Sequence, residues 1–241
     1  MGIFDNANKV MINNKEVQSL KIGTAVLYEK SSPTSKTLFE DACSSNANLS
    51  KYGSPISLYN TSISGTQSMT YNSSNVAYAL YGSTSNDYVY YPISDLDGKD
   101  DFTFEMEVKL NNSTNYPRIG LTISPSTSDL SSTYSDNIFV YRSSSSRTNC
   151  YSTRIRRTAT SNQSTGYVSQ NPTNWTKIKV VFSDTTSYVA TWETTTGSVL
   201  KTYNGTLSTT SKSDRHYGIH LRGNGSNYLG YIRNIKAERN D

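Results

Sequence analysis

The feature that most constrains this chain is the strict alternation of apolar and polar residues across residues 102–108, FTFEMEV. Successive side chains of a β-strand point to opposite faces, so Phe102, Phe104, Met106 and Val108 share one face of an extended segment. Amphipathic helical periods are absent from the sequence, and no helix-length spacer separates the strand-like runs. These patterns predict an all-β protein with antiparallel sheets.

Further strand-like runs recur along the body of the chain, with turn-forming clusters between them at the spacing of a β-sandwich. Hydrophobic residues make up only 34% of the sequence, but 19 Tyr, 6 Phe and 2 Trp supply large side chains for a core. This aromatic content distinguishes the chain from a disordered polar segment. We predict strands at Tyr88–Tyr91, Phe102–Val108, Arg118–Ser124, Asn137–Arg142, Cys150–Arg156, Trp175–Phe182, Ser187–Thr194, Val199–Tyr203, Tyr217–Arg222 and Tyr228–Glu238.

The N-terminal residues 9–30, KVMINNKEVQSLKIGTAVLYEK, differ in texture from the rest. The dipeptides Asn13-Asn14 and Gly23-Thr24 suit tight turns, because Asn and Gly adopt positive φ at low cost. A hairpin unit of this size is marginally stable alone and needs a partner surface. We therefore predict an attachment module at residues 1–30, a polar linker at 31–36 and one body at 37–241. The predicted module is a β-meander of three strands, Val10–Ile12, Glu16–Ile22 and Ala25–Glu29.

Three landmarks in the body carry a resemblance to a known fold. They are the opening segment Leu38–Asp41, the strand Asp101–Val108, and the pair formed by Asn174–Val180 and the closing Gly230–Lys236. In these segments the chain resembles the concanavalin A-like jelly roll of laminin-G domains and legume lectins. The resemblance implies that the last strand returns beside the first, so that linker and C-terminal tail leave the sandwich at one end. It implies no single function, because this fold hosts lectins, adhesion modules, glycoside hydrolases and virion decorations.

The N-terminal segment is similar to the opening of many phage and archaeal-virus tail or baseplate proteins. The resemblance implies a virion protein that is assembled in the host cytoplasm and acts outside the cell. It also implies docking on tail, baseplate or capsid components through residues 1–30, and a homo-oligomer. An ordinary N-terminal hairpin packed on the body is the alternative. The matching residues are Ile12, Asn13, Lys15–Val17, Leu20–Ile22 and Leu27–Glu29.

The expected role is that of a non-enzymatic, lectin-like receptor-binding protein whose jelly roll binds host-surface carbohydrate. A purely structural virion or capsid-decoration subunit without a ligand is the alternative. No segment reaches the length of about 18 apolar residues that a membrane helix needs, so no membrane insertion is expected. Residues 1–9, MGIFDNANK, lack the apolar core of a signal peptide, so no secretion address is expected.

Basic residues concentrate in one part of the chain, since residues 137–183 hold seven Lys and Arg and no Asp or Glu. Alternation places Arg154 and Arg156 together on one face of their strand. It places His220 and Arg222 on the solvent side of another strand. If both strands belong to one sheet, they form a cationic strip that suits an anionic glycan, since Arg forks bind carboxylate and phosphate. A solvated sheet face is the alternative, and the net charge of +4 with few interleaved aromatics argues against nucleic acid.

The aromatic residues provide candidates for sugar stacking. Trp175 opens an apolar strand and is expected in the core. Trp192 lies on the face opposite Val189 and Thr191, where it is either core or a stacking platform, and we include it among the candidate ligand-binding residues. Weaker stacking candidates near loops are Tyr116, Tyr134, Tyr167 and Tyr228.

Glu105 and Glu107 are the one carboxylate pair that resembles a glycoside hydrolase site, because residues i and i+2 share a face of a strand. The laminarinase-type enzymes of this fold carry a third carboxylate in the same row, but Thr103 and Lys109 stand at the two available positions. We therefore predict no enzymatic activity and expect the two glutamates to face solvent opposite cationic neighbours. A glycoside hydrolase that uses Glu105 and Glu107 is the alternative. No nucleophile elbow accompanies His220.

The segment DLDGKDD at residues 95–101 is the densest carboxylate cluster, and its Asp95, Asp97 and Asp100 are weak candidates for calcium. A solvated turn is the preferred interpretation, because Asp is common at turn positions. Cys43 and Cys150 stand in no metal or redox motif, so two thiols are expected. No cofactor is predicted.

Overall fold

The structure is a computed structural model that describes residues 11–12, 15–16, 19–22, 25–29, 37–58, 68–82, 88–111, 117–124, 136–142, 150–156, 162–171, 173–183, 187–207, 212–222 and 228–240. The backbone alone is described for the described residues up to 29, for residues 57–58, 150–156 and 162–169, and for residues 88, 124, 142 and 212. The chain divides into two units, residues 1–36 with Asp241 and residues 37–240.

The N-terminal unit contains two antiparallel pairs, β1 (Met11–Ile12) with β2 (Lys15–Glu16) and β3 (Ser19–Ile22) with β4 (Ala25–Glu29). Ile12 lies opposite Lys15 and Ile22 opposite Ala25. The two dipeptides predicted as turns lie between these paired residues, outside the described part of the chain. The three-stranded meander is wrong, because among the described strands β1–β2 and β3–β4 form separate sheets. The run predicted as one strand, Glu16–Ile22, contributes its two ends to different partners.

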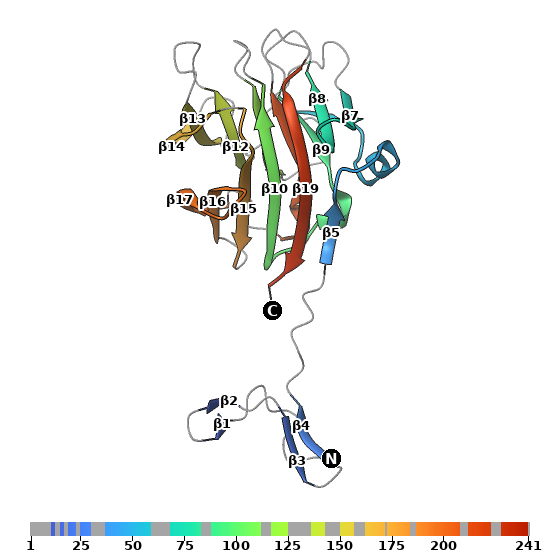
Figure 1. The fold of residues 1–241 in the computed structure, drawn as a ribbon, viewed down its shortest axis with the longest axis vertical. Coiled ribbons are helices and arrows are strands. Elements are labelled where there is room, and N and C mark those ends of the chain that lie inside the picture. The colour runs from blue at the N-terminus through green and yellow to red at the C-terminus, as the bar shows by residue number, and fades with distance from the viewer. Residues whose placement is uncertain are drawn as a thin grey trace. The chain divides into compact units, whose positions relative to one another are not determined.

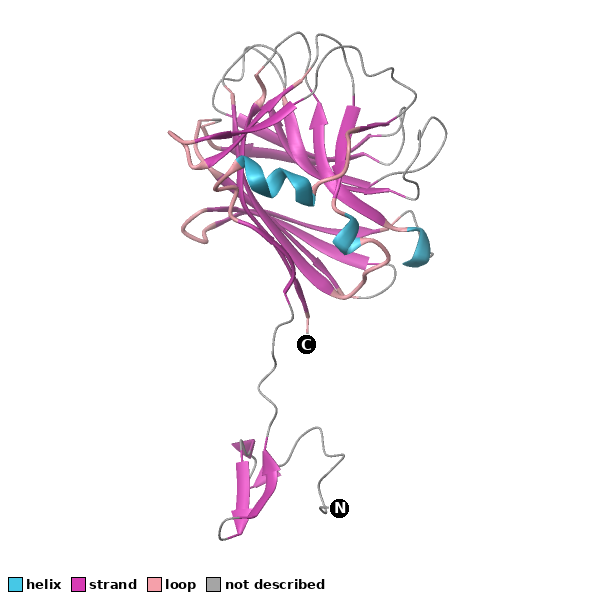
Figure 2. Ribbon diagram, turned by 90° about the vertical axis from the view of Figure 1, so that its right-hand side faces the viewer, coloured by secondary structure: helices cyan, strands magenta, loops and turns pink. Residues whose placement is uncertain are grey.

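The body is a sandwich of two antiparallel sheets (Figures 1 and 2). The eight-stranded sheet contains, in spatial order, β17 (Val199–Thr206), β16 (Ser187–Thr194), β15 (Thr176–Phe182), β10 (Phe102–Leu110), β19 (Gly230–Arg239), β8 (Ala77–Tyr81) and β7 (Ser68–Asn72), and β5 (Thr37–Asp41) also pairs with β19. The seven-stranded sheet contains β14 (Asn162–Ser169), β13 (Cys150–Arg156), β12 (Asp136–Arg142), β11 (Arg118–Ser124), β18 (His216–Arg222), β9 (Tyr88–Pro92) and β6 (Ile56–Leu58).

Short 3-10 helices lie in the connections of the body: η1 (Asn46–Lys51), η2 (Ser94–Leu96) and η3 (Lys212–Asp214). Figure 2 shows them beside the strands of the two layers. Within the described part of the chain, no helix is long and apolar enough to cross a membrane.

The core lies between the two sheets and is built from the alternating faces of their strands. Phe104 of β10 lies opposite Val180 of β15 and Ala237 of β19, and all three are buried. Aromatic rings fill much of the space, and the Phe102 ring centroid lies 4.7 Å from that of Phe182. Burial of one such ring contributes about 2–3 kcal/mol, which explains how a chain with few aliphatic residues forms a core.

A buried carboxylate ties β5 to its surroundings. Oδ1 of Asp41 accepts hydrogen bonds from the backbone N–H of Cys43 (2.7 Å) and from Nδ2 of Asn48 (3.1 Å). Oδ2 accepts from the hydroxyls of Tyr52 (3.0 Å) and Tyr78 (2.9 Å). Burial raises the pKa of the Cys43 thiol and of both tyrosines, so these groups stay protonated at neutral pH. The network fixes the first strand of the body against β8 and η1.

The two ends of the sandwich differ in what they carry. Thr37 pairs with Glu238 and Phe102 with Arg239, so the first and last strands of the body meet at one end, here termed the proximal end. This confirms the expected return of the last strand beside the first. At the opposite, distal end Leu110 pairs with Gly230. The nine residues of β10 separate the two ends by about 30 Å.

Candidate functional site

The predicted cationic strip lies on one face of the seven-stranded sheet, but its members are not neighbours. Arg154 lies opposite Phe139, Phe139 opposite Gly120, and Gly120 opposite His220. Residues that face each other across antiparallel strands share a face, so the expected common face is present in the backbone. Two strands, β12 and β11, separate β13 from β18, which places the two halves of the strip about 14 Å apart. The side chains of Arg154 and Arg156 lie outside the described residues.

His220 is fully buried, so its predicted solvent-side position is wrong. Its ring stacks on that of Phe139, with centroids 5.3 Å apart, and its Nδ1 lies 3.2 Å from Oγ1 of Thr122. That hydroxyl donates to Oδ1 of Asn137 over 2.7 Å. Gly120 lies between the two rings in the sheet, where a Cβ would stand 2.5 Å from that of Phe139. Alternation separates two faces, but it does not distinguish a solvated face from a second buried layer.

Arg222 is half-buried at the distal end of the same face, in register with Arg118 of β11. Arg118 is itself buried and lies over two rings, 5.6 Å from the Phe139 centroid and 5.1 Å from that of Tyr141. Arg118 is therefore packed against aromatic rings, which differs from the open strip that the sequence predicts for this face.

The structure decides between core and surface for the two tryptophans. Trp192 is fully buried in the core beside Ala190, so its assignment as a ligand-binding platform is wrong. Trp175 is only half-buried, so its expected place in the core is also wrong. The cause is parity, because Thr176, Ile178 and the other even-numbered residues of β15 face inward, which turns Trp175 outward.

Trp175 ends a row of four half-buried aromatic rings on the outer face of the eight-stranded sheet, here termed the distal aromatic row. Ring centroids lie 5.7 Å apart for Tyr81 and Tyr228, 5.1 Å for Tyr228 and Tyr231, and 6.5 Å for Tyr231 and Trp175. Burial and the hydrogen bond to Tyr231 raise the pKa of Tyr228, which keeps its hydroxyl protonated. The row crosses from β8 over β19 to the start of β15.

Two cations lie over the Trp175 end of the row. The guanidinium of Arg233 stands 4.1 Å from the Trp175 centroid, and the Nζ of Lys109 stands 5.9 Å from the centroids of both Trp175 and Tyr231. Arg233 also forms an ion pair with Glu107, with 2.7 Å between Nε and Oε2. These contacts hold the rings in place from one side, since a cation over an aromatic face contributes about 0.5–1 kcal/mol at exposed sites.

Beside Trp175 the surface forms a hollow of about 350 Å³, here termed the distal hollow. The turn after β16 shapes one wall, where Gly197 has a φ of +89° and Oγ1 of Thr194 accepts from the N–H of Ser198 over 3.0 Å. Nε2 of Gln170 donates to Oγ1 of Thr176 over 2.9 Å on the other side. The lining offers neutral hydroxyls, amides and one indole: Gln170, Thr173, Asn174, Trp175, Thr194, Thr195 and Thr196.

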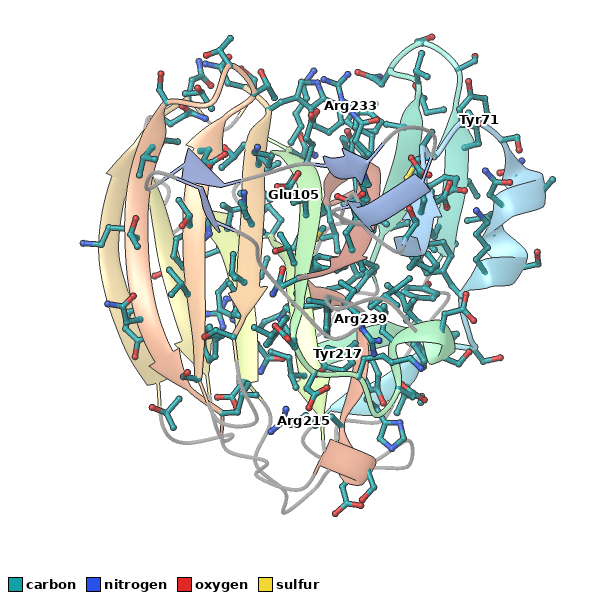
Figure 3. All side chains as sticks on the ribbon, turned by 90° about the horizontal axis from the view of Figure 1, so that it is seen from below. Tyr71, Glu105, Arg215, Tyr217, Arg233 and Arg239 are labelled. Atoms are coloured by element: carbon teal, nitrogen blue, oxygen red, sulfur yellow. The ribbon has the colours of Figure 1, made fainter. Side chains whose placement is uncertain are left out.

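The carboxylate pair of β10 is engaged in ion pairs (Figure 3 labels Glu105 and Arg233). Oε1 of Glu105 lies 3.4 Å from the Nζ of Lys179, and Glu107 pairs with Arg233 as described above. Both carboxylates lie on the outer face of the sheet, where β15 and β19 supply the cations. The contacts agree with the predicted solvent-facing pair opposite cations.

The predicted calcium candidates lie around η2 at the proximal end. Asp95 is exposed, and Oδ2 of Asp97 lies 2.9 Å from Nδ1 of His216. In the described portion of the chain, no group of three His, Cys, Asp or Glu side chains is placed to hold a metal ion. Cys43 is a buried free thiol, and the side chain of Cys150 lies outside the described residues.

No protein-family model matches the sequence, and no curated protein matches it. Solved structures do match over most of the chain. Peanut lectin superposes with a TM-score of 0.53 and 14% identity, covering 77% of this chain and 96% of the lectin. The CBM2 module of the evolved Dit of Lactobacillus casei BL23 phage J-1 gives 0.55 and 11%, covering 86% and 97%. A carbohydrate esterase from the Shiga toxin-encoding bacteriophage phi24B gives 0.55 and 12%, covering 86% and 100%.

These likenesses show the fold. The chain is an all-β, antiparallel, two-sheet sandwich of the lectin-like, concanavalin A-like type, and the predicted fold class is confirmed. Sequence analysis missed the distal aromatic row apart from Tyr228. Its other members come from β8, from β19 and from the residue just before β15, and only the order of the strands brings them together.

Proposed function

We propose that the chain is a carbohydrate-binding display protein and that the distal aromatic row with the distal hollow is its glycan site. The observation that carries the proposal is the combination, at one place, of half-buried aromatic rings and neutral hydrogen-bonding groups. The C–H faces of a pyranose stack on aromatic rings, while Thr hydroxyls and Asn or Gln amides match sugar hydroxyls. A concave site with an apolar floor and a few convergent polar groups is typical of small-ligand binding.

The composition of the distal end supports the same proposal. Seven connections join the strands there, and their sequences are rich in Ser, Thr, Asn and Gln, with only Asp87 and Arg147 charged. Their ranges are 59–67, 83–87, 112–116, 143–149, 170–175, 195–198 and 223–229. Binding loops of recognition domains commonly use such adaptable polar residues together with a few aromatic anchors.

The position of the site suits display. Thr37, where the body continues from residues 1–36, lies at the proximal end, and the distal hollow lies at the other end of the sheets. We propose that residues 1–30 dock on a virion component, in a tail or baseplate, and that the sandwich presents its distal end to the host surface. The likeness to a module of a phage Dit supports this placement. Copies arrayed on a virion, or a homo-oligomer, would make weak binding per site effective through avidity.

We propose no catalytic role. The ion pairs of Glu105 and Glu107 satisfy the only carboxylate pair considered for glycoside hydrolysis, which supports a structural role for both residues.

The test is pull-down of the full chain by intact host-type cell envelopes, comparing the parent with Trp175→Ala. Tyr203→Ala is the matched control, because Tyr203 is a half-buried aromatic residue of the same sheet that lies outside the row. Removal of a stacking ring weakens binding by about 1–3 kcal/mol, which is roughly fivefold to 150-fold. Equal binding by parent and Trp175→Ala would contradict the site. No binding of the parent to any envelope would favour a purely structural virion subunit.

A further inference from the structure

Lys109 stands apart from the other cations on the outer face of the eight-stranded sheet. Lys177 pairs with Glu193 (2.8 Å), and Lys179 and Arg233 pair with the glutamates of β10. Lys236 pairs with Glu238 (2.6 Å). Among the described residues, Lys109 is in no ion pair, and its recorded contacts are the faces of Trp175 and Tyr231.

The place of Lys109 in the sheet brings its charge to the glycan site. It lies opposite Tyr231 in the register of β10 and β19, one residue before the distal end of β10. A sugar ring stacked on Trp175 or Tyr231 therefore lies within reach of an ammonium that no described carboxylate neutralises. The rings and the strand partly exclude water from Lys109, which is half-buried, and this strengthens its interaction with an opposite charge.

The surroundings offer little to repel an anion. The distal hollow is lined by uncharged side chains. The nearest described carboxylates of the same face are Glu107 and Glu193, and each of them forms an ion pair with a cation of the sheet. A ligand with a negative group therefore meets one free positive charge beside neutral donors.

We infer that the glycan of this site carries an anionic substituent, a carboxylate or a phosphate, and that Lys109 binds it. The inference rests on the proposed function and adds the chemical class of its ligand. A compact ammonium with three donors suits either group as a point charge. Arg233 plays a different part, because Glu107 and the Trp175 face already hold its guanidinium.

The experiment measures binding of the full chain to three matched pairs of probes by calorimetry at low salt. The pairs are an oligogalacturonate and its methyl ester, sialyllactose and lactose, and a phosphorylated mannan oligosaccharide before and after phosphatase treatment. The first two pairs report on a carboxylate and the third on a phosphate. The acidic member of at least one pair is expected to bind about fivefold more tightly than its neutral partner, the factor for a partly exposed ion pair.

The variant is Lys109→Gln, which is expected to remove the acidic preference and to leave affinity for the neutral partner. Lys51→Gln is the matched control, since its Nζ also lies 5.9 Å from an aromatic centroid, that of Phe39, away from the site. Lys51→Gln should keep the preference. Thermal unfolding of both variants shows whether loss of the cation–ring contact lowers the stability of the protein.

Several outcomes separate this inference from the proposed function. Equal affinity within every pair, with binding lost in Trp175→Ala, would overturn the inference and leave the glycan site standing. An acidic preference that persists in Lys109→Gln would also overturn it. Failure of every probe to bind the parent would overturn the inference as well, and the envelope pull-down with Trp175→Ala would then decide the proposed function alone.

Discussion

Replacement of Asp41 by Ala removes one buried acceptor from four donors at once. The Tyr78 hydroxyl keeps a second acceptor, the carbonyl of Ser45 at 3.1 Å, and Asn48 is only partly buried. The N–H of Cys43 and the hydroxyl of Tyr52 lose their recorded acceptor in a buried site. Each unsatisfied buried group costs about 1–3 kcal/mol, so the two together lower the free energy of unfolding by about 4 kcal/mol. For a chain of this size that is a fall of about 8–16 °C in Tm.

Urea denaturation followed by circular dichroism measures this effect, with Glu40→Ala as the control. Glu40 is the neighbouring carboxylate and is exposed, and its recorded hydrogen bond, from Lys51, is to the backbone carbonyl that the substitution keeps. Glu40→Ala is therefore expected to stay within about 0.5 kcal/mol of the parent. If Asp41→Ala were as stable as Glu40→Ala, the reasoning that the buried network anchors β5 would be refuted.

Three further predictions concern stability. Burial raises the pKa of Tyr91 to about 12, above its value of about 10 in the unfolded chain. The contribution of neutral Tyr91 to the free energy of unfolding is therefore complete below pH about 10 and is lost as the pH rises through about 12. Circular dichroism should show stability falling in that window, and a flat profile would contradict the burial of the Tyr91 hydroxyl. Trp192→Ala should cost about 3–5 kcal/mol in urea and Trp175→Ala less than half of that, since only the first empties the core, and equal losses would contradict their placement. Gly120→Ala places a Cβ 2.0 Å from the carbonyl oxygen of Ile138, so we expect the free energy of unfolding to fall by about 1–3 kcal/mol. An unchanged Tm would show that the backbone of β11 and β12 moves apart there at no cost.

Sequence reasoning predicts the strands where one face is buried and the other is polar. β10 and β18 were expected within two residues of their observed bounds, because alternation along each of them is uninterrupted. It missed β14, whose sequence NQSTGYVS has no apolar period, and β7 and β8, which flank a short polar turn. Such strands form because they pair with neighbouring strands, and the local sequence pattern does not show which strands will be neighbours.

The candidate site was harder to predict because it depends on strand order and on one irregularity. Asn234 of β19 has a φ of +51° beside a register shift between Glu105 and Glu107. This bulge sets the pairing of Arg233 with the partner strand, and nothing in the sequence announces it. Trp175 could be placed from parity alone, by counting from Ile178, but the row also needs β8, β19, β10 and β15 to follow one another in that order across the sheet.

The central claim is that Trp175 touches the glycan, and the chain offers a direct reporter because it contains only two tryptophans. In Trp192→Phe, Trp175 is the sole source of indole fluorescence. Titration with polysaccharide extracted from a host envelope that binds the chain is predicted to shift and quench this signal. The reciprocal variant Trp175→Phe should show no change in the fluorescence of Trp192, which is buried in the core. Bound polysaccharide with unchanged Trp175 fluorescence would contradict the account.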